Sequence, residues 1–259
     1  MQEGFSEFSK YEQAISKARL SKYKYWALGD KHVALELYKI NQKMSVNFYK
    51  PLSVFELFLR NAIHAAMTEA YGECWIFYAG EYINENDHRT KDKHKSIGYK
   101  QKQEVKSKFN YIKRKNIKIH PDRFVGELSF SFWTTMFNKA YSEQWSQVIH
   151  RIFTNDTKKR FTVDDIDRIR DITFRVRRFR NRAMHHEPII GEKMYTIYDN
   201  IAEICCALSP HAQDIFCREI HDKDTFFRGY TNIPKNIRNR LQPKPSDRTG
   251  AKLKYHQRK

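Results

Sequence analysis

The stretch at 162–188, TVDDIDRIRDITFRVRRFRNRAMHHEP, decides the fold class of this chain. Its apolar residues recur every three or four positions, which places them on one side of an α-helix. Thr162 and Asp165 have the spacing of a cap that starts a helix. Pro188 predicts the end, because it lacks a backbone donor and disfavours helix at Glu187. The predicted buried stripe is Ile166, Ile169, Ile172, Val176, Phe179 and Ala183.

The rest of the chain carries the same helical period and few signs of strands. Only nine of the 259 residues are glycine, and apolar residues rarely alternate with polar ones. Ser53 and Glu56 fit a capping box that opens a helix at 54–71, with Gly72 as its stop. A separate helix is expected to close before Pro51. Further helices are predicted at 121–137, at 142–152, from Met194 onward and from Pro210 to about Ile220, so the sequence favours an all-α fold.

The charge of the chain points to a polyanionic partner. Its 48 Lys and Arg exceed its 30 Asp and Glu, for a formal net charge of +18. Nucleic acid is the usual partner of such a protein, and an anionic membrane surface is the alternative. No apolar run approaches the roughly 18 residues of a membrane span, and the N-terminus lacks the features of a signal peptide. Without a membrane span or signal peptide, we expect no membrane partner. The four cysteines (Cys74, Cys205, Cys206 and Cys217) form no CxxC pair, so we expect reduced thiols and a cytoplasmic location.

Two segments stand out by their basic charge. The segment 89–118 carries twelve Lys and Arg against two acidic residues, with Tyr99 and Tyr111 among them. A charge run is usually a solvated face, but this density favours contact with RNA. From Arg228 the chain is polar and basic with few core-forming residues, which predicts a mostly disordered tail. The sequence therefore divides into a helical domain at 1–227, with 89–118 inserted, and a basic tail at 228–259.

The reactive side chains gather directly before Pro188. On a helix, Asn181 and His185 lie one turn apart, and Arg178 joins the same face three residues before Asn181. Arg180 and Arg182 flank this face. Because the apolar stripe occupies the opposite face, these polar groups are expected to point away from the core.

Arginine, asparagine and histidine in this arrangement suit RNA cleavage in which the ribose supplies the nucleophile. The 2′-OH attacks the adjacent phosphate, so the protein needs an acid–base group near neutral pH and cations for the developing charge. Histidine, with an ordinary pKa of about 6.5, supplies the acid–base group, and arginine supplies the cation. Asparagine can orient the histidine or the phosphate. The predicted catalytic residues are Arg180, Asn181 and His185, with no metal ion or other cofactor. The predicted RNA-binding residues are Arg178, Arg182, His186, Lys100, Lys102, Lys106, Lys108, Lys113, Arg114 and Lys115.

Simpler interpretations of this segment stay open. Cations are favourable at any helix C-terminus, so these residues could form a solvated helix end. They could also bind phosphate without cutting RNA. A zinc site at His185 and His186 is not favoured, because no cysteine or acidic ligand stands at a suitable spacing.

Three blocks of sequence resemble a known family. Arg180-Asn181-x-x-x-His185 matches the R-N-x-x-x-H form of the HEPN ribonuclease motif. The blocks at 60–64 (RNAIH), 128–133 (LSFSFW) and 180–189 (RNRAMHHEPI) occur in the order seen in the Abi-like abortive-infection proteins of the AbiD/AbiF group. The resemblance spans roughly residues 20 to 225 and leaves out the basic tail.

This resemblance implies a fold and a function. HEPN domains are helical bundles, and the resemblance adds N-terminal helices to the bundle here. They usually form homodimers in which two R-N-x-x-x-H motifs build one cleft. Many cut RNA without a metal ion in toxin–antitoxin and phage-defence systems, and the Abi-like group is similar to the effector nucleases of type VI CRISPR systems. A structured small RNA, as antitoxin or partner, is implied as well.

Other interpretations of these residues stay open. Arg60, Asn61 and His64 could form a second half-site, contact RNA, or serve structure through a helical pair between Arg60 and Glu56. The aromatic cluster that includes Phe130, Phe132, Trp133 and Phe137 could stack bases, although such density is more typical of a core. The whole protein could be a HEPN-like scaffold that holds RNA without cutting it, or a basic protein that acts at membranes.

Overall fold

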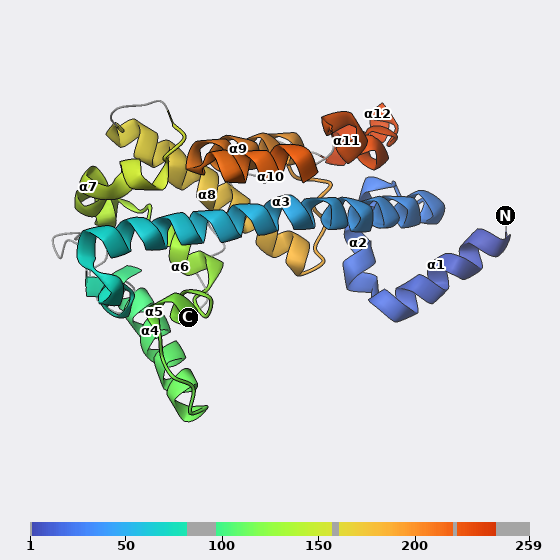
Figure 1. Cartoon of the computed structure of the whole chain (residues 1–259). Helices are drawn as coiled ribbons and strands as arrows, with labels where there is room; N and C mark the ends of the chain where they lie inside the picture. Colours follow the sequence, from blue (N-terminus) through green and yellow to red (C-terminus); the bar gives the residue numbers. More distant parts are fainter. Residues whose placement is uncertain (1, 82–96, 157–160, 220–221, 242–259) are drawn as a thin grey trace. The chain divides into compact units, whose positions relative to one another are not determined.

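The computed structural model describes residues 2–81, 97–156, 161–219 and 222–241 (Figure 1). All regular secondary structure within these ranges is helical. The helices are, in chain order, α1 (Gln2–Ile15), α2 (Lys17–Trp26), α3 (Lys31–Tyr71), the 3₁₀ helix η1 (Glu73–Glu81), α4 (Ile97–Arg114), α5 (Pro121–Val125), α6 (Phe130–Thr135), the 3₁₀ helix η3 (Lys139–Tyr141), α7 (Ser142–Ile152), α8 (Val163–Met184), α9 (Met194–Leu208), α10 (Pro210–Glu219), α11 (Lys223–Thr231) and α12 (Lys235–Leu241). The prediction of an all-α fold is confirmed for the described residues.

The chain divides into two compact units. Unit 1 consists of Met1–Pro51, Phe179–Tyr198 and Ile220–Lys259, and unit 2 consists of Leu52–Arg178 and Asp199–Glu219. Among the helices of the described residues, none is long and apolar enough to cross a lipid bilayer.

Helix α8 forms as its sequence predicts. The Thr162 hydroxyl accepts from the backbone N–H of Asp165 at 3.2 Å, and the Asp165 carboxylate accepts from the Thr162 N–H at 2.9 Å. These reciprocal bonds satisfy donors that a helix start leaves open. Five of the six stripe residues are buried and Ile166 is half-buried, so the apolar face is the one predicted from the spacing.

Helix α3 corrects the prediction of two helices around Pro51. It runs for 41 residues through Pro51, and Ser53 lies inside it rather than at its start. A proline inside a helix costs about 3 kcal/mol, whereas each buried large apolar side chain contributes roughly 1.5–3 kcal/mol. The buried stripe continues on both sides of the proline, so burial outweighs the lost hydrogen bond. Its members are Met44, Phe48, Leu52, Phe55, Leu59 and Ile63.

At several other helix ends, local capping residues set the boundary. Gly72 ends α3 with φ of +83°, and α7 has the predicted bounds. The Ser209 hydroxyl accepts from the Ala212 N–H at 3.1 Å at the start of α10. The helix predicted at 121–137 is instead split, because Gly126 caps α5 and Ser129 starts α6.

The predicted disordered tail is wrong for its first part. Residues 228–241 contribute to α11 and α12, and Tyr230, Ile233 and Leu241 are buried. A cluster of aromatic rings in unit 1 holds this region. Phe226 packs edge-on against Phe48 with ring centroids 4.9 Å apart. Residues 242–259 of the predicted tail and residues 89–96 of the basic segment lie outside the described residues.

The aromatic block at 130–137 belongs to the core of unit 2. Phe130, Phe132, Trp133 and Phe137 are all at most 5% exposed. Trp133 packs edge-on against Trp75 with ring centroids 6.3 Å apart. The core interpretation is therefore confirmed over base stacking for this block.

Candidate functional site

The end of α8, which carries the candidate catalytic residues, is a fixed turn. The N–H of His186 donates to the Ala183 carbonyl at 3.1 Å, and the N–H of Glu187 donates to the Arg182 carbonyl at 2.9 Å. Together with φ of +56° at His186, these bonds form a Schellman motif. The helix therefore ends at Met184 in its own capping turn. Pro188, at which the sequence predicts the end, lies beyond this turn.

Arg19 of α2 caps the same helix end from outside. Its Nη1 donates to the carbonyl of His185 at 3.2 Å and to that of His186 at 3.3 Å. A cation at a helix C-terminus is favourable because the carbonyls there carry the negative end of the helix dipole. The backbone at both histidines is therefore held by α2.

Asn41 of α3 holds the chain that follows the turn. Its side chain is fully buried, and its Oδ1 accepts from the N–H of Ile189 at 2.7 Å and of Ile190 at 3.2 Å. Its Nδ2 donates to the Glu187 carbonyl at 3.4 Å. Close packing supports the loop further, since a Cβ on Gly191 would lie 2.7 Å from the Trp26 ring.

The guanidinium group of Arg182 is bound by other residues of the protein. Its Nη2 donates to the Pro188 carbonyl at 2.7 Å, and its Nη1 pairs with Glu192 at 3.3 Å and with Glu187 at 3.7 Å. Its side chain is only 19% exposed. Burial, then Arg182, lower the pKa of nearby Lys22. These contacts give Arg182 a structural task, and its predicted contact with RNA stays a prediction.

The three candidate catalytic residues differ in their surroundings. Asn181 and His185 are exposed one turn apart, on the side away from the buried stripe, as the helical spacing predicts. Arg180 is half-buried, and its Nη1 donates to Asn181 Oδ1 at 3.4 Å. An exposed imidazole beside an arginine-oriented amide can exchange protons and donate hydrogen bonds to a phosphate. Arg178 and His186 are exposed as well.

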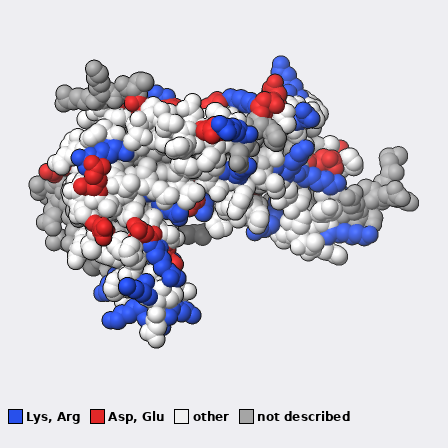
Figure 2. Space-filling view, viewed as in Figure 1, with Lys and Arg blue, Asp and Glu red and all other residues white. Residues whose placement is uncertain are grey.

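The candidate RNA-binding lysines cluster on and just after α4. Figure 2 shows Lys and Arg side chains gathered over this helix. Most of the predicted residues are exposed, and Lys108 is half-buried. Those predicted residues are Lys100, Lys102, Lys106, Lys108, Lys113, Arg114 and Lys115. Their accessibility fits contact with a polyanion, which stays a prediction.

His64 has a structural environment within unit 2. Its Nδ1 accepts from the Trp75 indole N–H at 3.1 Å, so its proton sits on Nε2, which lies 3.3 Å from Asp122 Oδ1. Its side chain is 14% exposed. Burial lowers the pKa of His64, and Asp122 partly opposes that shift. Arg60 Nε donates to Asn61 Oδ1 at 3.3 Å. The bonds of His64 favour a packing role over a second half-site.

Sequence reasoning did not identify Arg19 or Asn41. The only signal for Asn41 is its place in the apolar stripe of α3, four residues after Leu37 and three before Met44. Arg19 has no distinguishing local pattern. No group of three or more His, Cys, Asp or Glu side chains in the described part of the chain could hold a metal ion.

Replacing Asn41 should loosen the loop after α8. Asn41→Ala leaves the buried N–H groups of Ile189 and Ile190 without their acceptor, and each such group costs about 1–3 kcal/mol. We expect a lower free energy of unfolding in urea and faster amide exchange at both residues. The control is Asn47→Ala on the same helix, which loses one bond to the Phe226 carbonyl. An equal or smaller loss for Asn41→Ala would contradict this role.

The stability of the protein should fall in mild acid because of His64. Its folded pKa lies below that of the unfolded chain, about 6.5, so the unfolded state binds more protons between the two values. Stability is therefore complete above that window and is lost as the pH drops through it. Thermal melts between pH 8 and pH 5 should show a smaller decline for His64→Gln than for the wild type. His150→Gln, at an exposed position on α7, should keep the wild-type decline; if it does not, another group is responsible.

No protein-family model, curated protein or solved structure matches this chain. The resemblance to the Abi-like proteins therefore rests on the three blocks that carry it. The groups that bear on function are the polar side chains at the end of α8 and the basic side chains over α4.

Proposed function

We propose that this protein is an RNA-binding, metal-independent endoribonuclease whose reacting groups are Arg180, Asn181 and His185. One observation carries the proposal. A fixed helix end presents an exposed histidine and an exposed asparagine one turn apart, with an arginine hydrogen-bonded to the asparagine. The basic surface over α4 supports it, because a polyanionic substrate needs such a field.

The proposed reaction uses the nucleophile of the substrate. The ribose 2′-oxygen attacks the adjacent phosphorus, the bond to the 5′-oxygen breaks, and a 2′,3′-cyclic phosphate and a 5′-hydroxyl result. The 2′-hydroxyl loses its proton and the leaving 5′-oxygen gains one; His185 carries out one of these transfers and water carries out the other. Arg180 donates to the phosphate oxygens, where charge develops, and Asn181 orients Arg180. No step needs a metal ion.

We further propose that the biological role is abortive infection, in which the nuclease acts as a toxin against phage-infected cells. A structured small RNA is the proposed antitoxin or partner. This role rests on the three blocks that resemble the Abi-like proteins. A scaffold that holds RNA without cutting it is the alternative, and the same basic surface would serve it.

Two substitutions test the reacting groups. His185→Ala and Arg180→Ala should each lower the rate of RNA cleavage by about 10²–10⁴-fold, the usual effect of losing an acid–base group or a charge-stabilising donor. Cleavage by the wild type should persist in EDTA, and its products should end in cyclic or 3′-phosphates. The control is His150→Ala, which removes an exposed histidine of α7 that has no predicted contact with RNA and should leave cleavage unchanged. Undiminished cleavage by His185→Ala would refute the assignment, and a wild type that binds RNA without cutting would favour the scaffold.

The active form should be a homodimer. Arg180 and His185 are five residues apart, which places them roughly 140° apart around the helix, too far for one copy to aim both at one phosphate. A second copy supplies the missing group from its own α8. Light scattering should therefore give twice the chain mass in the absence or presence of RNA. A strict monomer that still cuts RNA would contradict the shared site.

A further inference from the structure

We propose that the hollow at the end of α4 binds an unpaired base of single-stranded RNA. The base would lie against the Phe109 ring, and the flanking phosphates would meet Lys113 and Lys118. This inference rests on the proposed binding of RNA and names its class as single-stranded. It does not depend on cleavage at His185.

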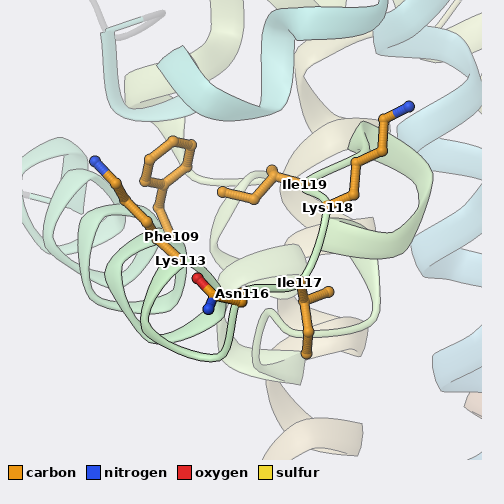
Figure 3. Close-up of a pocket in the computed structure, with 6 residues that line it drawn as sticks. All are labelled: Phe109, Lys113, Asn116, Ile117, Lys118 and Ile119. Atoms are coloured by element: carbon orange, nitrogen blue, oxygen red, sulfur yellow. The ribbon is translucent and has the colours of Figure 1, made fainter.

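The hollow is open to solvent and has a mixed apolar and basic lining. Its volume is about 500 Å³, comparable to that of small-molecule pockets. Figure 3 shows the Ile119 side chain directed toward the Phe109 ring, while the ammonium groups of Lys113 and Lys118 extend to opposite sides. An apolar surface between two cations matches a base between two phosphates. The lining residues are Phe109, Lys113, Asn116, Ile117, Lys118 and Ile119.

The Phe109 ring is anchored yet accessible. It is 37% exposed, and it packs edge-on against Phe77 of η1 with ring centroids 6.0 Å apart. Phe77 in turn packs against Phe124 of α5 at 5.2 Å. Support from these rings limits the motion of Phe109, so a stacked base would gain contact at little cost in side-chain entropy.

The backbone around the hollow is equally constrained. Helix α4 ends in a Schellman motif in which Asn116 has φ of +53°, with bonds from Asn116 N–H to the Lys113 carbonyl and from Ile117 N–H to the Ile112 carbonyl. The other end of α4 lies against η1, where a Cβ on Gly80 would come within 2.4 Å of the Gly98 carbonyl oxygen. Helix α4 is therefore packed against η1 at its start and ends in a hydrogen-bonded turn, so a defined backbone lines the hollow.

Charge selects the kind of ligand. The segment 97–118 carries eight Lys and Arg and one acid, Glu104, whose carboxylate accepts from the Ser129 N–H at 2.6 Å. The carbonyls at the helix end disfavour a phosphate directly at the turn, so a neutral base fits there while phosphates lie beside the lysines. A base within a duplex is stacked on both faces and cannot enter. The combination therefore favours a single strand.

The binding test uses fluorescein-labelled RNA that cannot be cut. A 12-nucleotide 2′-O-methyl single strand and the duplex of the same sequence are titrated against the full chain by anisotropy. Phe109→Leu should weaken single-strand binding about 5–150-fold without changing its salt dependence, because stacking is not electrostatic. Lys113→Gln should flatten the log–log salt slope by about 0.7. Phe174→Leu, at a 53% exposed ring of α8 outside the hollow, makes the same change of side chain and should bind as the wild type.

Two further measurements keep the test decisive if Phe109→Leu folds poorly. Phe109→Tyr keeps the ring and should keep the affinity. Wild-type protein irradiated with a 4-thiouridine-substituted strand should cross-link within residues 109–119. Cross-links elsewhere, equal losses for Phe174→Leu, or equal losses for the duplex would overturn the proposal. So would a changed oligomeric state in Phe109→Leu with binding intact, since the hollow would then be a protein contact.

The outcomes separate this inference from the proposed nuclease. Phe109-dependent binding by a protein that cuts no RNA would support the pocket and refute only the nuclease. Cleavage with Phe109-independent binding would refute only the pocket. Failure of the wild type to bind either oligonucleotide would refute both.

Discussion

The buried amide of Asn41 ties α3 to the chain after α8 by three hydrogen bonds, and the presentation of the candidate site depends on that tie. Two buried backbone donors would otherwise lack an acceptor, at a cost of about 1–3 kcal/mol each. The Schellman turn at His186 and the cap by Arg19 hold the same helix end, so His185 is presented at a fixed position. These contacts explain why residues far from the motif in sequence matter to it.

Helices α4 and α8 end with the same backbone conformation. Each helix ends with a non-glycine residue in the left-handed region, Asn116 in one case and His186 in the other. Glycine is the usual residue there, and asparagine and histidine are among the few side chains that adopt it with modest strain. In both places the turn carries a polar side chain where glycine would carry none. Each helix end therefore offers a hydrogen-bonding group at a fixed position.

How much the sequence reveals depends on the distance between the partners. Capping at Thr162, at Gly72 and at Ser209 involves neighbours in the chain, so α8, the end of α3 and the start of α10 were predictable. The passage of α3 through Pro51 was not, because the burial that outweighs the proline comes from residues far away in sequence. The same holds at 228–241, where local composition is polar but Tyr230 meets Tyr195 of α9. The neighbouring Phe226 and Phe227 pack against rings of α3 and α9. At the site, exposure of Asn181 and His185 followed from helical geometry, whereas the contacts of Arg182 depend on a loop shape that no spacing rule provides.

The separation of Asn41 from Glu187 by 146 residues has a consequence for biosynthesis. A ribosome adds roughly 5–20 residues each second, so the loop that Asn41 holds emerges about 7–30 seconds after Asn41 itself. Arg19 waits longer still for the carbonyls of His185 and His186, 166 and 167 residues away. During that interval the nascent chain lacks the turn that presents His185. The arrangement at the end of α8 can therefore form only once residue 190 has been made, and every shorter nascent chain lacks the contacts that hold it.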